Sequence, residues 1–363
     1  MPNRAEPDRA LLGELLACHA TPGDEGDVRD VLERRWRRAR WPLRRLGDFA
    51  VLATAPRPAD PDAPLLLVCA HMDSPGFAVH AVPRANPRRH PRFPVWPLTE
   101  LGGPAFPGAT ADGRLRCGAG LVPVTLRKIG GIGVGGGEAE ETNSSIVCSA
   151  TADADPQMLA LVRPGDRVCF AAPPVAEGDR ITAPFLDNRL GCWIVAELPR
   201  LAARWRARFR IVVAATSAEE FTGHGAAVLA HHLRPDLTIV LDATYANPEQ
   251  HVAPGGGPVL TLSDRSVLIA PARRDALADA FARAEIPLQT EVYNYSGTDA
   301  RAFPLQGVFT PVLPLLIATT GNHTPQEGAD LRDAVTLLRA IRLLAETGHT
   351  VGCGQLASLD VKR

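Results

Sequence analysis

The sequence is poor in lysine, which occurs only at Lys128 and Lys362, so arginine provides nearly all of its 39 basic side chains. Forty acidic residues balance them and leave a formal net charge of −1. A chain without excess positive charge has no general attraction for a nucleic-acid backbone or an anionic membrane surface. We therefore expect neither a nucleic acid nor a membrane among the partners of this protein.

Long apolar runs and paired cysteines are also missing. No run reaches the roughly 18 apolar residues of a membrane helix, and residues 1–10 lack the apolar core of a signal peptide. The seven cysteines are scattered, and none of them forms a Cys-x-x-Cys pair. The pattern does not support a disulfide framework or a zinc ribbon, and it predicts free, buried thiols in a reducing, cytoplasmic compartment.

The remaining composition is that of an ordinary globular protein, with 45% apolar and 22% charged residues in 363. This length suits two domains, or one domain with a large insertion. Strand and helix patterns alternate at both ends of the sequence, which predicts an α/β fold: a mixed sheet with helices on both faces. The expected helices span 9–20, 27–40, 189–203, 223–233, 273–285 and 331–347, and the expected strands 63–73, 209–216, 238–243, 259–262, 288–293 and 308–318.

Between residues 79 and 180 the pattern changes to short apolar runs that proline and glycine interrupt. This texture predicts an inserted small β-barrel-like domain, so that residues 1–78 and 181–363 form one interrupted α/β domain. Within the insertion, Gly131 to Gly136 match the Gly-x-Gly-x-x-Gly pattern of dinucleotide sites. Glutamates and no apolar helix follow it, so we interpret Gly130 to Gly137 as a loop of unassigned role.

Polar side chains follow the expected strands, at the sheet edge where α/β proteins place their sites. His71 and Asp73 end the strand at 63–73, Glu219 and Glu220 follow the next strand, and Asp242 ends the third. Asp187 opens a helix, and His323 follows the strand at 308–318. Imidazole nitrogens and carboxylate oxygens together suit zinc, manganese or cobalt.

Each of these residues also has an ordinary structural interpretation. A lone histidine at a strand end is usually a hydrogen-bonded surface residue, Asp187 is a typical helix N-cap, and paired glutamates usually face solvent. The argument for a metal is collective, because gathering carboxylates at one edge without a cation is costly. The residues by themselves leave both interpretations open.

Six short motifs, which occur in the same order as in one known family, favour the metal-site interpretation. The chain resembles the tetrahedral aminopeptidases, the glutamyl and deblocking aminopeptidases of the dinuclear metallopeptidase clan, in residues 70–77, 186–191, 218–220, 241–244, 297–300 and 323–327. The resemblance implies a metal-dependent aminopeptidase that removes N-terminal residues from peptides. It also implies a catalytic metallopeptidase domain at 1–78 and 181–363, and a homo-oligomer, a dodecamer whose dimer contacts the β domain at 79–180 makes. The Gly/Pro-rich divergence of 79–180 leaves a plain dimer as the alternative.

The same resemblance implies the roles of individual residues. One divalent ion is expected on His71, Asp187 and Asp242 and a second on Asp187, Glu220 and His323, with zinc expected and cobalt or manganese as alternatives. Glu219 is expected as the general base. Asp73 is expected to accept a hydrogen bond from the second imidazole nitrogen of His71.

Two alternatives to this function stay open. Carboxypeptidases and N-acyl amino acid deacylases of the same metal clan would need a site for a substrate carboxylate, and a non-enzymatic scaffold would need no ligands. Arg301 also departs from the family pattern, which has a small residue after 298–300. It could bind an acidic N-terminal residue of the substrate, or instead face solvent or pair with an acid such as Glu291.

Overall fold

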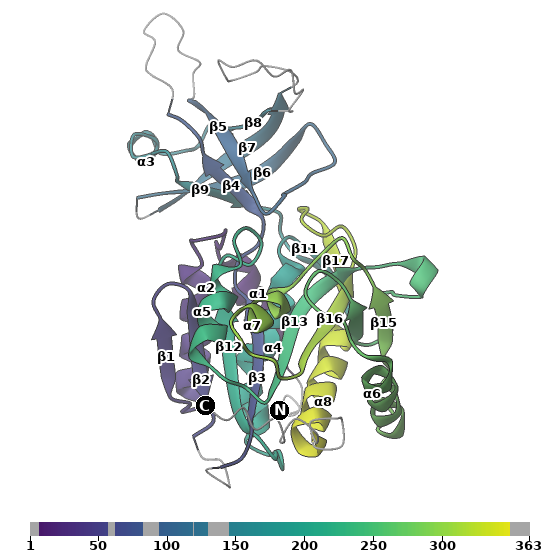
Figure 1. Ribbon diagram of the computed structural model, residues 1–363. Coiled ribbons are helices and arrows are strands. Elements are labelled where there is room, and N and C mark those ends of the chain that lie inside the picture. Colours follow the sequence, from purple (N-terminus) through teal and green to yellow (C-terminus); the bar gives the residue numbers. More distant parts are fainter. Residues whose placement is uncertain (1–6, 57–61, 83–93, 119, 130–144, 349–363) are drawn as a thin grey trace, which may run out of the picture.

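The computed structural model describes residues 7–56, 62–82, 94–118, 120–129 and 145–348, and Figure 1 shows a β-barrel standing above an α/β domain. The glycine loop expected at 130–137 lies outside the described residues. Among the described residues, no helix is both long and apolar enough to cross a membrane. The six described cysteines are buried and free, as predicted.

The α/β domain is built on an eight-stranded sheet with the order β1-β2-β12-β3-β13-β16-β14-β15. The four central strands β12, β3, β13 and β16 run parallel to one another, and antiparallel pairs join β2 and β14 to them. The sheet is therefore mixed. Its strands are β1 (Leu43–Leu46), β2 (Ala50–Thr54), β3 (Leu65–His71), β12 (Arg210–Thr216), β13 (Leu237–Tyr245), β14 (Val259–Ser263), β15 (Gln289–Val292) and β16 (Val312–Thr319).

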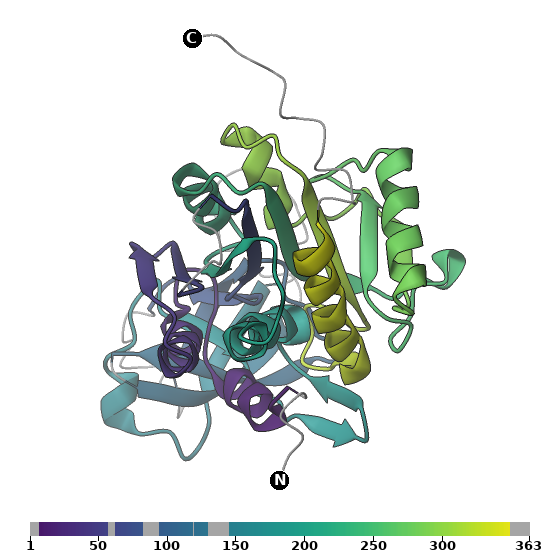
Figure 2. The same cartoon turned by 90° about the horizontal axis from the view of Figure 1, so that it is seen from below.

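Helices cover both faces of this sheet, which confirms the expected fold class. On β3, Leu66 and Val68 face the core that includes helices α1, α2, α4, α6 and α8, whereas Leu65 and Leu67 face α5 and α7. The view from below shows α1, α2, α4 and α8 together (Figure 2). The helices are α1 (Arg9–Ala17), α2 (Gly26–Arg38), α4 (Leu186–Ala202), α5 (His224–His232), α6 (Pro271–Arg283), α7 (Ala302–Leu305) and α8 (Leu331–Thr347), with short 3₁₀ turns η1 (Pro248–Gln250) and η2 (Asp299–Arg301).

The middle of the chain forms a closed barrel with the order β4-β5-β8-β7-β6-β9. It has its own apolar core, in which the rings of Phe77 and Phe170 meet edge to face at 5.9 Å, and which includes the buried Trp96. The short helix α3 (Pro156–Leu159) packs against it. The barrel strands are β4 (Gly76–Val79), β5 (Val95–Leu101), β6 (Thr110–Cys117), β7 (Gly120–Ile129), β8 (Ser145–Ala150) and β9 (Arg167–Phe170).

A small antiparallel sheet links the barrel to the end of the chain. Its order is β10 (Val175–Glu177), β11 (Arg180–Ala183) and β17 (Glu327–Asp330). The first of its strands belongs to the range 79–180, whereas β4 of the barrel begins before residue 79. The division of the chain into domains at 78 and 181 stays a prediction.

Several element ends differ from those expected. The strand expected at 308–318 begins at Val312, directly after Pro311, which has no N–H to donate to a neighbouring strand. The first helix ends at Ala17, because Cys18 is extended. The hairpin of β1 and β2 was not predicted at all, because Arg44 and Arg45 interrupt any apolar alternation at this exposed edge. Helix α8 spans 331–347, as expected.

Candidate metal centre and active site

The predicted site residues converge at one edge of the central sheet, where β3, β12, β13 and β16 end. His71 is the last residue of β3, and Asp242 lies near the end of β13. Glu219 and Glu220 follow β12, His323 follows β16, and Asp187 lies at the start of α4. Parallel neighbours end at the same edge, so residues far apart in the sequence meet here.

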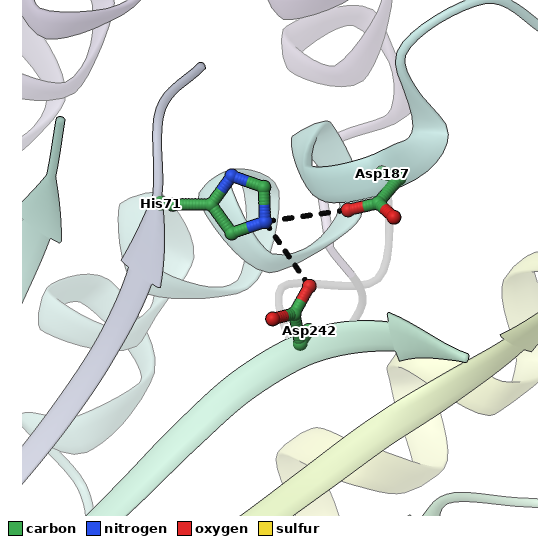
Figure 3. A group of neighbouring side chains, drawn as sticks. All are labelled: His71, Asp187 and Asp242. Carbon is green, nitrogen blue, oxygen red and sulfur yellow. Dashed lines mark hydrogen bonds and ion pairs between the residues drawn. The ribbon is translucent and has the colours of Figure 1, made fainter. Parts of the chain in front are cut away.

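His71, Asp187 and Asp242 form a first, buried group (Figure 3). The Nε2 atom of His71 lies 3.1 Å from Oδ1 of Asp242 and 3.3 Å from Oδ1 of Asp187. The side chains of His71 and Asp242 are only 2% and 7% exposed. Carboxylate oxygens from two different elements therefore face one imidazole nitrogen.

Asp187, Glu220 and His323 form a second, more open group. The Nε2 atom of His323 lies 3.4 Å from Oε2 of Glu220 and 3.8 Å from Oδ2 of Asp187, and the His323 side chain is 26% exposed. Asp187 belongs to both groups, since one of its oxygens faces each histidine. The structure thus brings together all five residues that were expected to be ligands.

These groups fit divalent ions. Ligand atoms at about 2.0–2.1 Å from one tetrahedral ion lie about 3.3 Å from each other, which is close to the separations observed here. Among the described residues, Oδ1 of Asp187 and Oε1 of Glu220 are buried without a hydrogen-bond partner, an arrangement that a cation would satisfy. Mixed nitrogen and oxygen donors suit zinc, manganese and cobalt.

The pKa shifts of the site residues also favour a bound cation. Burial raises the pKa of Glu220 well above its usual range, and the nearby Asp187 carboxylate raises it further. Burial also raises the pKa of Asp242 to about 7, although His71 opposes the shift. Burial would lower the pKa of His71, but Asp242, Asp187 and Asp73 outweigh it and raise that pKa well above its usual range. The site therefore holds more negative charge than its own histidines balance.

Asp73 holds the two glutamates through their backbone. Its Oδ1 accepts a hydrogen bond from the N–H of Glu219 at 3.0 Å, and its Oδ2 accepts one from the N–H of Glu220 at 3.1 Å. Toward His71, the Asp73 carbonyl oxygen lies 3.1 Å from Nδ1, and the carboxylate lies 3.6 Å from it. Asp73 thus contacts the segments on both sides of the site.

Glu327 has an equivalent position that the sequence analysis missed. Its Oε2 accepts a hydrogen bond from the N–H of Asp187 at 2.8 Å, and its Oε1 accepts one from the N–H of His323 at 2.9 Å. It is 1% exposed. An acidic residue four positions after an expected ligand was the available signal, but only the fold shows which backbone groups it contacts.

Two further residues brace the same segments. Arg189 is fully buried and donates to the carbonyl of Met72 at 2.5 Å and to Oγ of Ser74 at 3.2 Å. Ser74 in turn donates to the carbonyl of Asp187 at 2.6 Å.

The barrel also contacts the site, because the N–H of Ala105 donates to the carbonyl of His323 at 2.8 Å. The β5–β6 loop of the barrel therefore touches the second ligand group directly.

A cavity of about 320 Å³ opens onto both groups. Glu219 lines it and is 9% exposed, and burial raises its pKa well above the usual range. Arg301 lines it too and makes no ion pair with any residue the structure describes. The expected alternative partner Glu291 instead accepts hydrogen bonds from Thr244 and Thr261, each at 2.7 Å. Among the described residues, those that line a larger cavity of about 640 Å³ include no acidic side chain.

Known proteins resemble this chain in sequence and in fold. A Lactococcus lactis glutamyl aminopeptidase is 27% identical over 90% of this chain and 93% of its own length. An Acetivibrio thermocellus protein is 32% identical over 52% of this chain, a match that spans 58% of that protein. The solved Pyrococcus horikoshii TET1 peptidase, described as able to assemble into a tetrahedron or a large octahedral shell, has the same fold, with a TM-score of 0.75 at 20% identity over 93% of this chain and 98% of its own.

The family comparison gives the more specific result. The family model described as M42 glutamyl aminopeptidase matches residues 135–339, more than half of the chain. These residues include four of the five expected ligands and Glu219, and they exclude only His71, which precedes the barrel. The resemblance seen in the sequence motifs is confirmed, and the chain belongs to the M42 glutamyl aminopeptidase family.

Proposed function

We propose that the protein is a metal-dependent aminopeptidase that removes N-terminal residues from peptides. The observation that carries this proposal is the pair of ligand groups that share Asp187 beside Glu219, in one cavity. Membership of an aminopeptidase family supports it, and favours it over a carboxypeptidase, a deacylase or a scaffold. Hydrolysis that requires a free N-terminal amine on the substrate would separate it from a deacylase.

His71, Asp187 and Asp242 would hold one divalent ion, and Asp187, Glu220 and His323 a second; zinc is proposed, with cobalt or manganese as alternatives. Such ions lower the pKa of an attacking water and polarise the scissile carbonyl when they are bound. Glu219 takes the proton from the attacking water and passes it to the leaving amine.

The backbone contacts explain why Glu219 and Glu220 can differ in role. Asp73 fixes both N–H groups, so the two side chains leave one short turn in set directions. Glu220 reaches His323, whereas Glu219 lies in the cavity without an ion pair to either histidine among the residues described. One glutamate is therefore available to bind a metal and the other to exchange a proton.

The test is Glu219→Gln, compared with Glu220→Gln. We expect Glu219→Gln to keep both metals and to lower turnover of aminoacyl anilides by at least ~10²-fold, the lower end of general-base effects. Glu220→Gln should lose metal as well as activity. Elemental analysis and hydrolysis of Glu, Leu, Lys and Ala anilides, with Zn²⁺, Mn²⁺ or Co²⁺, measure both. An active Glu219→Gln enzyme would contradict the assignment.

We also propose that the protein is a homo-oligomer, a dimer or a dodecamer, whose contacts the barrel makes. Membership of the family and the assembled Pyrococcus structure support this. Light scattering at micromolar concentration should give a multiple of 38.7 kDa. A monomer mass would contradict it. The cytoplasmic location stays a prediction.

A further inference from the structure

All three tyrosines of this 363-residue chain lie in one row beside the candidate site. The ring centres of Tyr245 and Tyr293 are 6.1 Å apart, and those of Tyr293 and Tyr295 are 6.0 Å apart. The rings are tilted by 60° and 59°, so each pair is in contact without stacking face to face. All three line the cavity that contains the metal-ligand groups.

The two ends of the row differ in their distance from the ligands, and neither ring is fully buried. Tyr245 lies three residues after Asp242 in β13, and burial, together with the carboxylates of Asp187 and Glu220, raises its pKa to about 12. It is therefore uncharged at neutral pH and close to the ligands. Tyr245 is 41% exposed, and Tyr295, at the far end, is 81% exposed. The row thus runs from beside the candidate metal centre to its most exposed ring, Tyr295.

Packing in the apolar core does not explain why the Tyr295 ring is kept at this position. An aromatic ring that is four-fifths exposed contributes little burial to folding, since stabilisation follows the apolar area removed from water. Aromatic rings held in a row at a cavity wall are, however, well suited to contacts with apolar side chains and peptide groups. This arrangement points to a ligand rather than to packing.

The direction of the row identifies which part of a peptide it meets. In an aminopeptidase only one residue precedes the scissile bond, so the rest of the peptide extends from the reacting carbonyl toward the cavity mouth. Alternate side chains on one face of an extended peptide are about 6.7 Å apart, close to the spacing of the tyrosine rings. Consecutive rings can therefore contact successive side chains on the same face of the peptide.

We propose that Tyr293 and Tyr295 form a subsite for the residues that follow the scissile bond, with a preference for apolar and aromatic side chains. This subsite rests on the proposed aminopeptidase function. Its tyrosines select the leaving part of the peptide and take no part in the proton transfer that Glu219 performs.

The test uses Ala-Xaa-Ala-Xaa tetrapeptides in which both Xaa residues, which lie on one face of an extended peptide, are Phe, Leu or Gly, and it measures release of the N-terminal alanine by the metal-loaded enzyme. Tyr295→Ala should lower the ratio of kcat/KM for Phe over Gly by about three- to tenfold, the range of one aromatic contact. Tyr295→Phe should keep the wild-type ratio. Phe309→Ala is the matched control, because Phe309 is a 78% exposed aromatic residue outside the cavity lining, and it should also keep the ratio.

A parallel series of Xaa-Ala-Ala peptides identifies the peptide position. If Tyr295→Ala changes the ratio only in this series, the row binds the N-terminal residue and the proposal is wrong. If the wild-type enzyme cleaves both series but neither ratio changes in Tyr295→Ala, the proposal is also wrong, while the aminopeptidase function stands. If the wild-type enzyme cleaves no peptide with any metal, the proposed function fails, and the subsite fails with it.

Discussion

The two ligand groups share Asp187 but differ in how the fold holds them. His71 and Asp242 lie on β3 and β13, adjacent strands in the middle of the sheet, and both are buried. Glu220 and His323 lie on loops after β12 and β16, and His323 is a quarter exposed. One group is fixed by the strand ladder of the central sheet, whereas the other depends on a few hydrogen bonds to its loops.

Those few hydrogen bonds come from buried carboxylates. Asp73 accepts from the N–H of Glu220, and Glu327 accepts from the N–H of His323. His323 also has a φ of 65°, a left-handed conformation that non-glycine residues adopt at some cost. The second group is therefore the one that loses its geometry first when a supporting contact is removed. We expect its ion to be the weaker bound of the two.

The largest effect should follow from removing the residue that both groups share. Asp187→Ala deletes a ligand from each group, so both ions should be lost and activity with them. His323→Ala is the contrasting variant, and it should lose the ion of the second group alone. Elemental analysis of folded protein, with circular dichroism as the check on folding, measures both. Full metal occupancy in Asp187→Ala would show that the two groups do not share this residue.

An intermediate effect should come from Glu327→Gln. Its amide offers one acceptor where the carboxylate offers two, so an N–H of Asp187 or His323 loses its partner. Asp187 is held in addition through its carbonyl by Ser74, so the second group should suffer more. We expect about 10- to 100-fold weaker binding of the second ion, the usual cost of losing such a supporting contact.

Titration of Co²⁺-loaded protein with a competing chelator resolves the two ions for this variant. The wild type should release the two ions in two steps as the chelator concentration rises. In Glu327→Gln the weakly bound ion should leave at a lower chelator concentration, while the tightly bound ion should leave at nearly the same concentration as in the wild type. Glu177→Gln, at an exposed glutamate of β10, serves as control and should match the wild type. An equal shift of both steps would show that Glu327 acts on Asp187 alone.

The sequence predicted well the two ligands that lie on buried central strands. A continuous apolar run such as residues 65–70 must be covered on both faces, and parallel strands end together, so His71 and Asp242 could be placed at one edge from pattern alone. The exposed edge was different. Strand β1 contains Arg44 and Arg45 and is only four residues long, so local pattern gave no signal for it.

The loop-borne part of the site was predicted less completely. Glu220 and His323 were named as candidates from the strand ends, and the family resemblance gave their places in the second ligand group, but Glu327 and the tyrosine row were not assigned. Their roles depend on which backbone N–H or ring lies opposite, and those partners lie between 2 and 140 residues away in the sequence. Contacts of this kind arise from the tertiary fold and leave no periodic trace in the sequence.

The smallest effect is expected at Arg301, on the open side of the site. Its guanidinium lies beside Gly223, where a Cβ atom would be 3.1 Å from Nη2, and it lines the cavity without an ion pair to any described residue. Such a cation can pair with the carboxylate of an acidic N-terminal residue. Arg301→Ala should then lower kcat/KM for Glu anilides by about tenfold relative to Leu anilides, near the 1.4 kcal/mol of one charged hydrogen-bonded contact. Metal content should not change, because no described ligand contacts Arg301. An unchanged ratio would show that the charge faces solvent and that the open side selects its substrate by other contacts.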